Sequence, residues 1–368
     1  MNSFIFILVL ILIPVFIATI FIPYWTRRTD SFGVTIPAEI FYRTDIKGMR
    51  KRYAVSTSIL SLLLTVIFLI SITFLPNNEN SISILFSAIL TFYIISSFLV
   101  YVKYHTDMKR IKEKENWINE NSQLVFVDIR FRDQKLTYSN LWFLFSFLIT
   151  IVTIILTLQS HQQIPDRIPM QYNFAGEVTN WAEKSYRSVL LNPVMQMYLT
   201  ILFLFINKMI ARAKQQIDPE NPEESIRKNV LFRRRWSAYI IITGLALTVM
   251  FTIIQLSFIY HINQQVLTFI PLIVTLGLII GSIILSITTG QGGSRVKSIS
   301  EKNGNVINRD DDKYWKLGQF YFNKEDPALF LEKRFGVGWT INLARPMAWI
   351  IFFGIIGFAF AIPFLLGA

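Results

Sequence analysis

Long uninterrupted apolar runs dominate the chain, in place of the alternation at a period of two or 3.6 residues that half-buried strands and amphipathic helices show. Runs of about 20 apolar residues can cross a hydrocarbon layer roughly 30 Å thick as helices. None of the runs contains Asp or Glu. The pattern therefore predicts an all-α integral membrane protein with about eight transmembrane helices. The runs are Asn2–Trp25, Ala54–Leu75, Ile82–Val102, Leu141–Leu158, Leu190–Ala211, Ser237–Tyr260, Val266–Gly290 and Ala344–Leu366.

Composition supports the same class. Of the 368 residues, 52% are hydrophobic and only 16% are charged, whereas about a quarter of a soluble protein is charged. The chain has no cysteine, which excludes a disulfide framework and a cysteine-based metal or redox site. The first apolar run ends in aromatic residues and a pair of arginines rather than in the small residues of a cleavage site. We therefore expect it to be retained as the first helix.

The net charge of +12 is distributed very unevenly between the loops. Loops 26–53, 103–140, 212–236 and 291–343 carry 31 Lys and Arg residues, whereas the alternate loops 76–81, 159–189 and 261–265 carry 3. By the positive-inside rule, the basic loops lie in the cytoplasm and both termini lie outside the cell membrane. The charge then indicates contact with anionic headgroups of the lipid bilayer and no nucleic-acid partner.

This topology divides the chain into regions. Residues 1–140 form a three-helix membrane region with two basic cytoplasmic loops, and residues 141–290 form a membrane domain of four helices. Residues 291–343 form a cytoplasmic aromatic-rich mini-domain, and 344–368 contain the last helix. Segment 159–189 is the one sizeable loop expected outside, where it would cover the ends of two helices as a lid.

The mini-domain is expected to be a small α+β segment. The stretch "KLGQFYFN" resembles a strand, and Asp326 followed by Pro327 is typical of a helix start. Gly336 stands where the C-terminal cap of that helix belongs, and "VGWTINL" predicts a second strand. Another strand is expected at "QLVFVDIRF", residues 123–131.

The lid contains turn-forming and amphipathic residues that suggest a partner-binding surface. Asn173 and Gly176 supply turn chemistry, and Gly176 is expected to have a positive φ. The lid could be a structural strap in which Tyr172 and Trp181 anchor at the membrane interface, or a docking surface in which they contact a partner. The candidate ligand- or partner-binding residues are Pro169, Gln171, Tyr172, Asn173, Gly176, Glu177, Trp181 and Lys184.

The stretch "IPDRIPMQYNFAGEVTNW", with Lys184 and Ser185 soon after it, resembles the signature of an uncharacterised membrane domain that accompanies SdpI-type bacterial immunity proteins, with the motif IPxxYNxxGE. The matching positions are Pro169, Asn173, Gly176, Glu177 and Lys184. That family often has His where this chain has Gln171, so a protonation or metal role of the His does not carry over. Residues 311–346 resemble a small aromatic-rich domain of unknown activity. The resemblance implies a bacterial cell-membrane protein in immunity, resistance or signal sensing.

Candidate chemistry is sparse elsewhere. The acidic run from Asp310 to Asp312 could hold a divalent cation, but such runs are more often solvated or paired with lysines. His105, His161 and His261 lack the paired spacing of a zinc site. No nucleophile elbow, phosphate loop or dinucleotide fingerprint is present. We therefore expect no enzymatic activity, no catalytic residue, no metal and no cofactor.

Three functions are considered, of which the third, an intramembrane enzyme, is the least supported. The first is a non-enzymatic sensor or immunity protein, whose lid engages an extracellular peptide or envelope component and whose cytoplasmic loops engage a regulator. The second is an uncoupled transporter or facilitator of a small or amphipathic solute. Ion-coupled carriers usually need buried carboxylates, which the apolar runs lack. Polar residues available to line a facilitator are Thr150, Thr153, Thr157, Asn207 and Gln255.

Overall fold

The computed structural model describes residues 2–75, 79–117, 134–173, 176–216, 221–297 and 311–366. Within these residues, eight helices are long and apolar enough to cross a membrane, which confirms the predicted fold class and indicates a multi-pass membrane protein. The strand expected at 123–131 lies outside the described residues. The helices are α1 (Asn2–Trp25), α2 (Thr44–Thr73), α3 (Glu79–Glu115), α5 (Phe143–Gln159), α7 (Leu191–Arg212), α8 (Pro222–Leu256), α9 (Gln264–Thr289) and α10 (Pro346–Leu366).

Several helices extend beyond the apolar runs into polar sequence. Helix α2 begins at Thr44 rather than at Ala54, because Ile46, Met49 and Tyr53 continue a buried stripe at helical spacing. Helix α8 begins with Pro222, where proline is favoured because its missing N–H would have no partner in the first turn. These extensions place charged side chains on regular helices rather than on loops.

The chain forms two compact units, to which α8 and α9 each contribute a part. Unit 1 contains Met1–Gln134, Ala213–Phe232 and Ile283–Arg345. Unit 2 contains Lys135–Arg212, Arg233–Ser282 and Pro346–Ala368.

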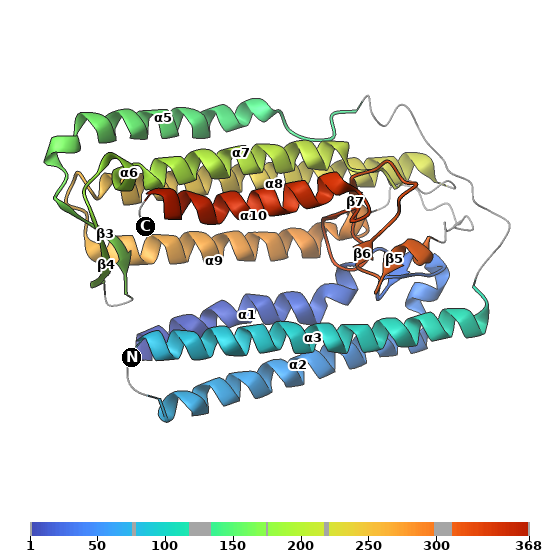
Figure 1. Cartoon of the computed structure of the whole chain (residues 1–368). Coiled ribbons are helices and arrows are strands. Elements are labelled where there is room, and N and C mark those ends of the chain that lie inside the picture. The colour runs from blue at the N-terminus through green and yellow to red at the C-terminus, as the bar shows by residue number, and fades with distance from the viewer. Residues whose placement is uncertain are drawn as a thin grey trace. The chain divides into compact units, whose positions relative to one another are not determined.

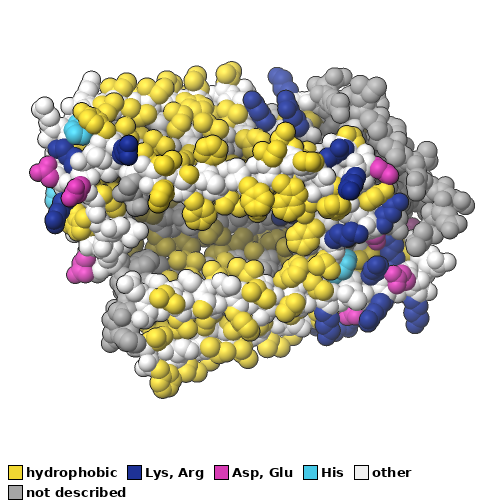
Figure 2. Space-filling model, viewed as in Figure 1, with side chains coloured by type: hydrophobic (Ala, Val, Ile, Leu, Met, Phe, Trp, Pro, Cys, Tyr) yellow, Lys and Arg dark blue, Asp and Glu magenta, His cyan; other side chains and the backbone are white. Residues whose placement is uncertain are grey.

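In unit 1, α1, α2 and α3 lie side by side (Figure 1). An apolar core with Leu8 of α1, Phe68 of α2 and Tyr93 of α3 joins the three helices. Figure 2 shows an apolar surface along these helices, with Lys and Arg side chains gathered at the end where α3 finishes. We call this end of unit 1 its basic end.

Short antiparallel strand pairs belong to unit 1 in addition to its helices. The pairs are β1 (Asp30–Ser31) with β2 (Val34–Thr35), β5 (Trp315–Lys316) with β6 (Phe320–Tyr321), and β7 (Phe330–Glu332) with β8 (Trp339–Ile341). The 3-10 helices are η1 (Ala38–Tyr42), η4 (Gln291–Gly293) and η5 (Asp312–Tyr314). The stretch "KLGQFYFN" is therefore a turn flanked by two strands rather than one strand.

The prediction of a helix after Asp326 and Pro327 is wrong, because this segment is not helical. Asp326 does accept a hydrogen bond from the Ala328 N–H at 3.0 Å, as an N-terminal cap would. Its other carboxylate oxygen accepts from the Tyr321 hydroxyl at 2.8 Å and from the Lys214 ammonium group. These contacts with Tyr321 and Lys214 lie outside a helical first turn, and the chain continues into β7, which pairs with β8. Gly336, with φ +89°, lies in the turn between them instead of capping a helix.

In unit 2, α5 packs on α7, and α10 packs on α7 and on the short helix α6 (Tyr186–Val189). The Tyr198 hydroxyl of α7 donates to the Ile355 carbonyl of α10 at 2.8 Å. The 3-10 helices η2 (Asn140–Trp142) and η3 (His161–Gln163) flank α5. Between η3 and α6 the chain forms an antiparallel hairpin of β3 (Arg167–Tyr172) and β4 (Val178–Glu183).

Candidate functional site

The β3–β4 hairpin of unit 2 carries the residues that the sequence predicts as a docking surface (Figure 1). Its inner side is fixed by a small apolar cluster of Ile164, Ile168, Val189 and Phe258, against which Met170 packs. Phe258 follows the end of α8, so the hairpin is anchored to a long helix. This anchoring favours a hairpin with one fixed orientation relative to the helices of its unit.

The hairpin turn is closed by hydrogen bonds within the chain. The Asn173 side chain donates to the Glu177 carboxylate at 2.9 Å and accepts from the Glu177 N–H at 2.8 Å. The Gly176 N–H donates to the Asn173 carbonyl at 3.0 Å. Gly176 has φ +86°, which confirms the predicted positive φ, a conformation that glycine adopts without steric cost. Asn173, Gly176 and Glu177 therefore build the turn.

Lys184 holds the base of the hairpin. Its ammonium group donates to the Ile164 carbonyl at 2.7 Å, and its backbone N–H donates to the Asp166 carbonyl at 2.8 Å. The ion pair with the Asp166 carboxylate spans 3.7 Å, but this carboxylate is fully exposed, so the pair contributes little. Ser185 then begins α6 through a capping box with Ser188.

The remaining predicted residues contribute to the hairpin surface. Gln171 lies opposite Asn180, and both side chains are exposed. Pro169 lies opposite Trp181, whose side chain is 52% exposed. Irregularities in the register on either side of Gln171 change the pairing offset between the strands. We call the exposed residues Gln171, Asn180 and Trp181 together the docking face; Asn180 and Trp181 are consecutive in β4, so their side chains project from opposite sides of the two-stranded sheet.

Tyr172 is neither fully buried nor fully exposed. It lies opposite Val178 and is half-buried, and burial raises the pKa of its hydroxyl. Pro169 is also half-buried. The eight predicted residues thus lie together on one hairpin, but they divide between the turn, the base and the surface.

Sequence reasoning missed an aromatic pair beside this hairpin. The ring of His161 in η3 stacks on Tyr186 in α6 with 4.4 Å between ring centroids. Tyr186 is 64% exposed, and the buried Nε2 atom of His161 has no hydrogen-bond partner in the described part of the chain. The pairing brings together residues on either side of the hairpin, so no local pattern would have revealed it.

Unit 1 contains a group of acidic and basic residues that are largely shielded from solvent. Glu332 of β7 is fully buried, forms an ion pair with Arg27, and accepts a hydrogen bond from the Asn229 side chain at 2.8 Å. Arg334 forms ion pairs with Asp311 and Asp312. We call the group of Arg27, Asp30, Lys112, Asp311, Asp312, Glu332 and Arg334 the buried charge cluster.

The acidic run considered as a cation site belongs to this cluster. The Lys112 ammonium group lies 2.7 Å from the Asp312 carboxylate. Burial opposes ionisation of Asp312, but the positive charges of Arg334 and Lys112 outweigh it and lower the pKa of this carboxyl. Asp311 and Asp312 thus pair with cationic side chains, and Asp310 lies outside the described residues.

Burial also shifts the pKa values of Asp30 and Arg27 in this cluster. Burial raises the pKa of Asp30 to about 6, although the charges of Arg334 and Arg27 oppose this shift. Burial also lowers the pKa of Arg27 to about 10, with Asp30 opposing the change. The shifts identify Asp30 as a carboxyl that titrates near neutral pH, a property with no signal in the sequence.

Two Phe-Gly turns join the C-terminal segment to α2 and α3. Phe32 and Phe335 stack with 6.0 Å between centroids and share a buried cluster with Tyr53 and Tyr101. Gly33 has φ +76°, and a Cβ there would lie only 2.6 Å from the Gly318 carbonyl oxygen. The close approach explains why the short strands of residues 311–345 fold although they are too few for a core of their own.

Comparison with known proteins finds two matches, one that includes the β3–β4 hairpin and one in the C-terminal part of the chain, and both are to families of unknown function. Residues 148–197 match a domain of unknown function, DUF1648. Residues 324–349 match a family of unknown function, DUF5808. No curated protein and no solved structure matches the chain. The two matches are consistent with an uncharacterised membrane family, and the resemblance to SdpI-type proteins stays a prediction.

The DUF1648 match spans the second half of α5, the hairpin and the start of α7. Inside unit 2, polar side chains of these helices bond to one another or to backbone. The Gln255 amide of α8 donates to the Thr157 hydroxyl at 3.1 Å and to the Val189 carbonyl at 3.0 Å. The Gln196 amide donates to the Thr252 hydroxyl at 2.9 Å. The hydrogen bonds of Gln255 thus connect α8 and α5 to α6 at the base of the hairpin.

The other polar residues considered for a facilitator are also buried and bonded. Thr153 lies 3.3 Å from the Thr252 hydroxyl, and Thr150 donates to the Ser146 carbonyl at 2.9 Å. The Asn207 amide donates to the Tyr138 carbonyl at 3.1 Å. The Thr153–Thr252 contact joins α5 to α8, the Asn207 bond joins α7 to the chain before η2, and the Thr150 bond lies within α5.

Proposed function

We propose that the protein is a non-enzymatic immunity, resistance or signal-sensing protein whose β3–β4 hairpin docks an extracellular peptide or envelope component. The carrying observation is Trp181, a 52% exposed tryptophan on a hairpin whose turn is closed by its own Asn173, Gly176 and Glu177. Tryptophan is enriched among residues that dominate binding energy, since it offers a large contact area with little conformational freedom to lose.

Preorganisation supports this proposal. Binding is weakened by the entropy lost when a loop becomes ordered, so a hairpin that is already fixed binds more tightly with the same contacts. Here the turn, the contacts of Lys184 and the cluster around Phe258 fix the hairpin before any partner arrives. The exposed amides of Gln171 and Asn180 add hydrogen-bonding groups to the same hairpin.

The shape of the sheet favours an extended peptide as the partner. In the described residues β3 and β4 form a two-stranded sheet, so neither outer edge is paired with another strand. An extended peptide can add to such an edge through backbone hydrogen bonds, while neighbouring side chains provide specificity. The docking face would supply that specificity.

Charge asymmetry supports the orientation in the proposal. By the positive-inside rule, the 31 to 3 distribution of Lys and Arg between alternate loops favours an orientation in a bacterial cell membrane with the hairpin and both termini outside and the basic end of unit 1 facing the cytoplasm. A cytoplasmic regulator would then meet the basic end. The hydrogen bonds of the Gln255 amide to Thr157 and to the Val189 carbonyl favour this account over an uncoupled facilitator, because these polar groups already bond to protein.

Two tryptophans provide a matched test. Trp142 in η2 is also 52% exposed, but it precedes α5, whereas the hairpin follows α5. Cells producing wild-type protein, Trp181→Ala or Trp142→Ala are challenged with a panel of membrane-active peptides, and survival and membrane abundance are measured. We expect wild type to protect against at least one peptide, Trp181→Ala to lose protection and Trp142→Ala to keep it. Equal protection by both variants at equal abundance would refute docking through Trp181.

A further inference from the structure

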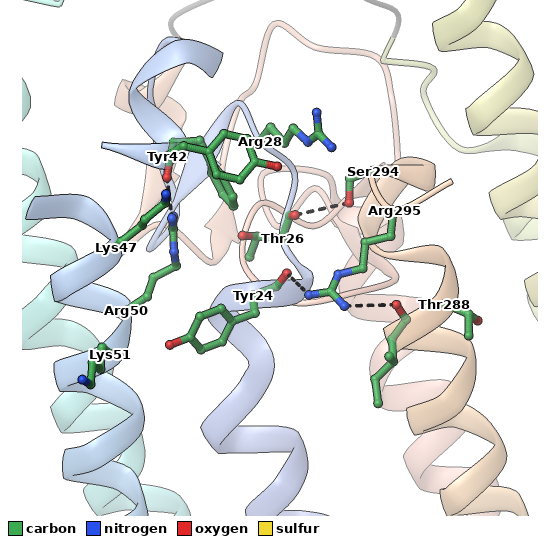
Figure 3. Close-up of a pocket in the computed structure, with 12 residues that line it drawn as sticks. Tyr24, Thr26, Arg28, Tyr42, Lys47, Arg50, Lys51, Thr288, Ser294 and Arg295 are labelled. Atoms are coloured by element: carbon green, nitrogen blue, oxygen red, sulfur yellow. Dashed lines mark hydrogen bonds between the residues drawn. The ribbon is translucent and has the colours of Figure 1, made fainter. Parts of the chain in front are cut away.

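A second candidate site lies at the basic end of unit 1, outside both matched domains (Figure 3). A cavity of about 830 Å³ lies between the end of α1, the start of α2 and the end of α9. Its charged lining residues are all cationic: Arg28, Lys47, Arg50, Lys51 and Arg295. A hollow with this lining attracts anions.

Arg50 is the deepest of these cations, since only 3% of it is exposed. One guanidinium nitrogen, Nη2, donates to the Phe41 carbonyl, and the guanidinium carbon lies 3.9 Å from the centroid of the Phe41 ring. The other nitrogen, Nη1, is buried without a hydrogen-bond partner among the described residues. A buried donor without an acceptor is costly, so a group that brings an acceptor into the cavity would gain a hydrogen bond from Nη1.

The other cations are also available for a ligand. Arg28 and Lys47 each lie 5.4 Å from the centroid of the Tyr42 ring. In the described ranges, no carboxylate forms an ion pair with any of the five cationic lining residues. Nearby Arg43, by contrast, pairs with Asp45 at 2.7 Å and with Glu115 at 2.5 Å. The absence of carboxylate partners is therefore a property of the cavity and not of every cation in this part of unit 1.

The wall of the cavity opposite α2 is fixed by backbone contacts. Arg295 donates to the Tyr24 carbonyl at 3.0 Å and to the Ile287 carbonyl at 3.2 Å, so it connects the ends of α1 and α9 (Figure 3). The Ser294 hydroxyl donates to the Thr26 carbonyl at 3.3 Å. These contacts hold Arg295 on one side of the space while Lys47, Arg50 and Lys51 come from α2 on the other (Figure 3).

We propose that this cavity binds a phosphate group, carried either by the headgroup of an anionic lipid or by a soluble phosphate compound. Arg guanidinium groups match the oxygens of phosphate, and several cations without competing carboxylates suit its charge. Tyr24 and Ile287 stand at the ends of apolar helices, where headgroups of a bilayer lie. Both sources of phosphate share one chemistry at the site, and a choice of probes separates them.

The test uses the full chain purified in an uncharged detergent, with binding followed by titration calorimetry. The probes are dihexanoyl phosphatidylglycerol, glycerol 1-phosphate and, as a zwitterionic control, dihexanoyl phosphatidylcholine. The test variant combines Lys47→Gln with Lys51→Gln, two exposed residues that line the cavity. The control combines Arg52→Gln with Lys103→Gln, which are exposed in the same unit, lie off the cavity lining and change the net charge equally.

We expect saturable binding of an anionic probe, weakened about tenfold or more by the test variant and by less than about twofold in the control. Binding of the lipid alone would identify a headgroup site, and binding of glycerol 1-phosphate would identify a soluble ligand. No saturable binding of either probe, or equal loss in both double variants, would overturn the proposal. Arg50→Gln is expected to lose binding too, and wild-type affinity in that variant would equally refute it. If Arg50→Gln fails to accumulate, the exposed pair still decides.

Discussion

In the β3–β4 hairpin Trp181 is 52% exposed, whereas in the C-terminal segment Trp315 is 5% exposed, between Tyr321 and the guanidinium group of Arg334. The acidic residues differ in the same way, since Glu177 is exposed and Glu332 is fully buried. Both regions are short hairpins with positive-φ glycines, so their local structure is similar. Burial is what separates a surface available to a partner from a segment that holds unit 1 together.

The largest expected effect is on stability, when the buried Glu332 is removed and the result is compared with removal of the exposed Glu177. Glu332→Ala removes the carboxylate that pairs with Arg27, whose side chain is only 14% exposed, and breaking a buried ion pair costs on the order of 3–5 kcal/mol. We expect this variant to accumulate poorly or to melt at a much lower temperature in detergent. Glu177→Ala serves as the comparison and should change the melting temperature only slightly. Comparable losses in both would contradict the distinction between the two hairpins.

The next effect concerns the pH dependence of unit 1. The pKa of Asp30 is raised from 3.8 to about 6, so the folded protein binds a proton more tightly than the unfolded chain. The stability from this group is fully present below pH 3.8 and is lost as the pH rises through about 6. Asp30→Asn should remove about 2–3 kcal/mol of this dependence, since one pKa unit corresponds to about 1.4 kcal/mol.

The measurement is the apparent melting temperature of wild type and Asp30→Asn in detergent between pH 4 and pH 8. The difference between the two curves isolates Asp30, because other carboxylates such as Asp312 titrate in both proteins. We expect the wild type to lose stability relative to the variant as the pH rises. A constant difference would show that Asp30 does not titrate in this range.

A smaller effect distinguishes the two positive-φ glycines. Gly336→Ala would bring a Cβ to 3.0 Å from Ile22, whereas a Cβ at Gly176 would lie at ordinary contact distances, 3.6 Å from Gln264 and 3.9 Å from Thr268. Both variants carry the strain of a positive φ, on the order of 1 kcal/mol, but only Gly336→Ala adds crowding. Thermal melting should therefore rank Gly336→Ala as the less stable. The reverse order would indicate that the hairpin turn matters more to the fold than the looser contacts at Gly176 imply.

The apolar helices were predictable because a membrane requires long helices with internally bonded backbones. The positive φ of Gly176 also followed from local turn chemistry. The helix expected after Asp326 did not form, because Lys214 and Tyr321, distant in sequence or on another strand, take up the carboxylate. Local cap signals carry no information about such partners.

The candidate site was only partly predictable for a related reason. The IPxxYNxxGE motif located the hairpin, but it did not separate turn residues from the docking face, because that division depends on the register of β3 and β4. The buried charge cluster was missed altogether. Arg27 and Glu332 are 305 positions apart, so their pairing leaves no periodic signal in the sequence.

The most direct test of the docking proposal is the affinity of the purified protein for a peptide against which it protects cells. The dissociation constant is measured in lipid nanodiscs for wild type, Trp181→Ala and Trp142→Ala. Truncation of a central aromatic contact costs on the order of 2 kcal/mol, so Trp181→Ala should bind about 30-fold more weakly, and Trp142→Ala should bind like wild type. Unchanged affinity in Trp181→Ala would contradict the account and make the hairpin a structural strap.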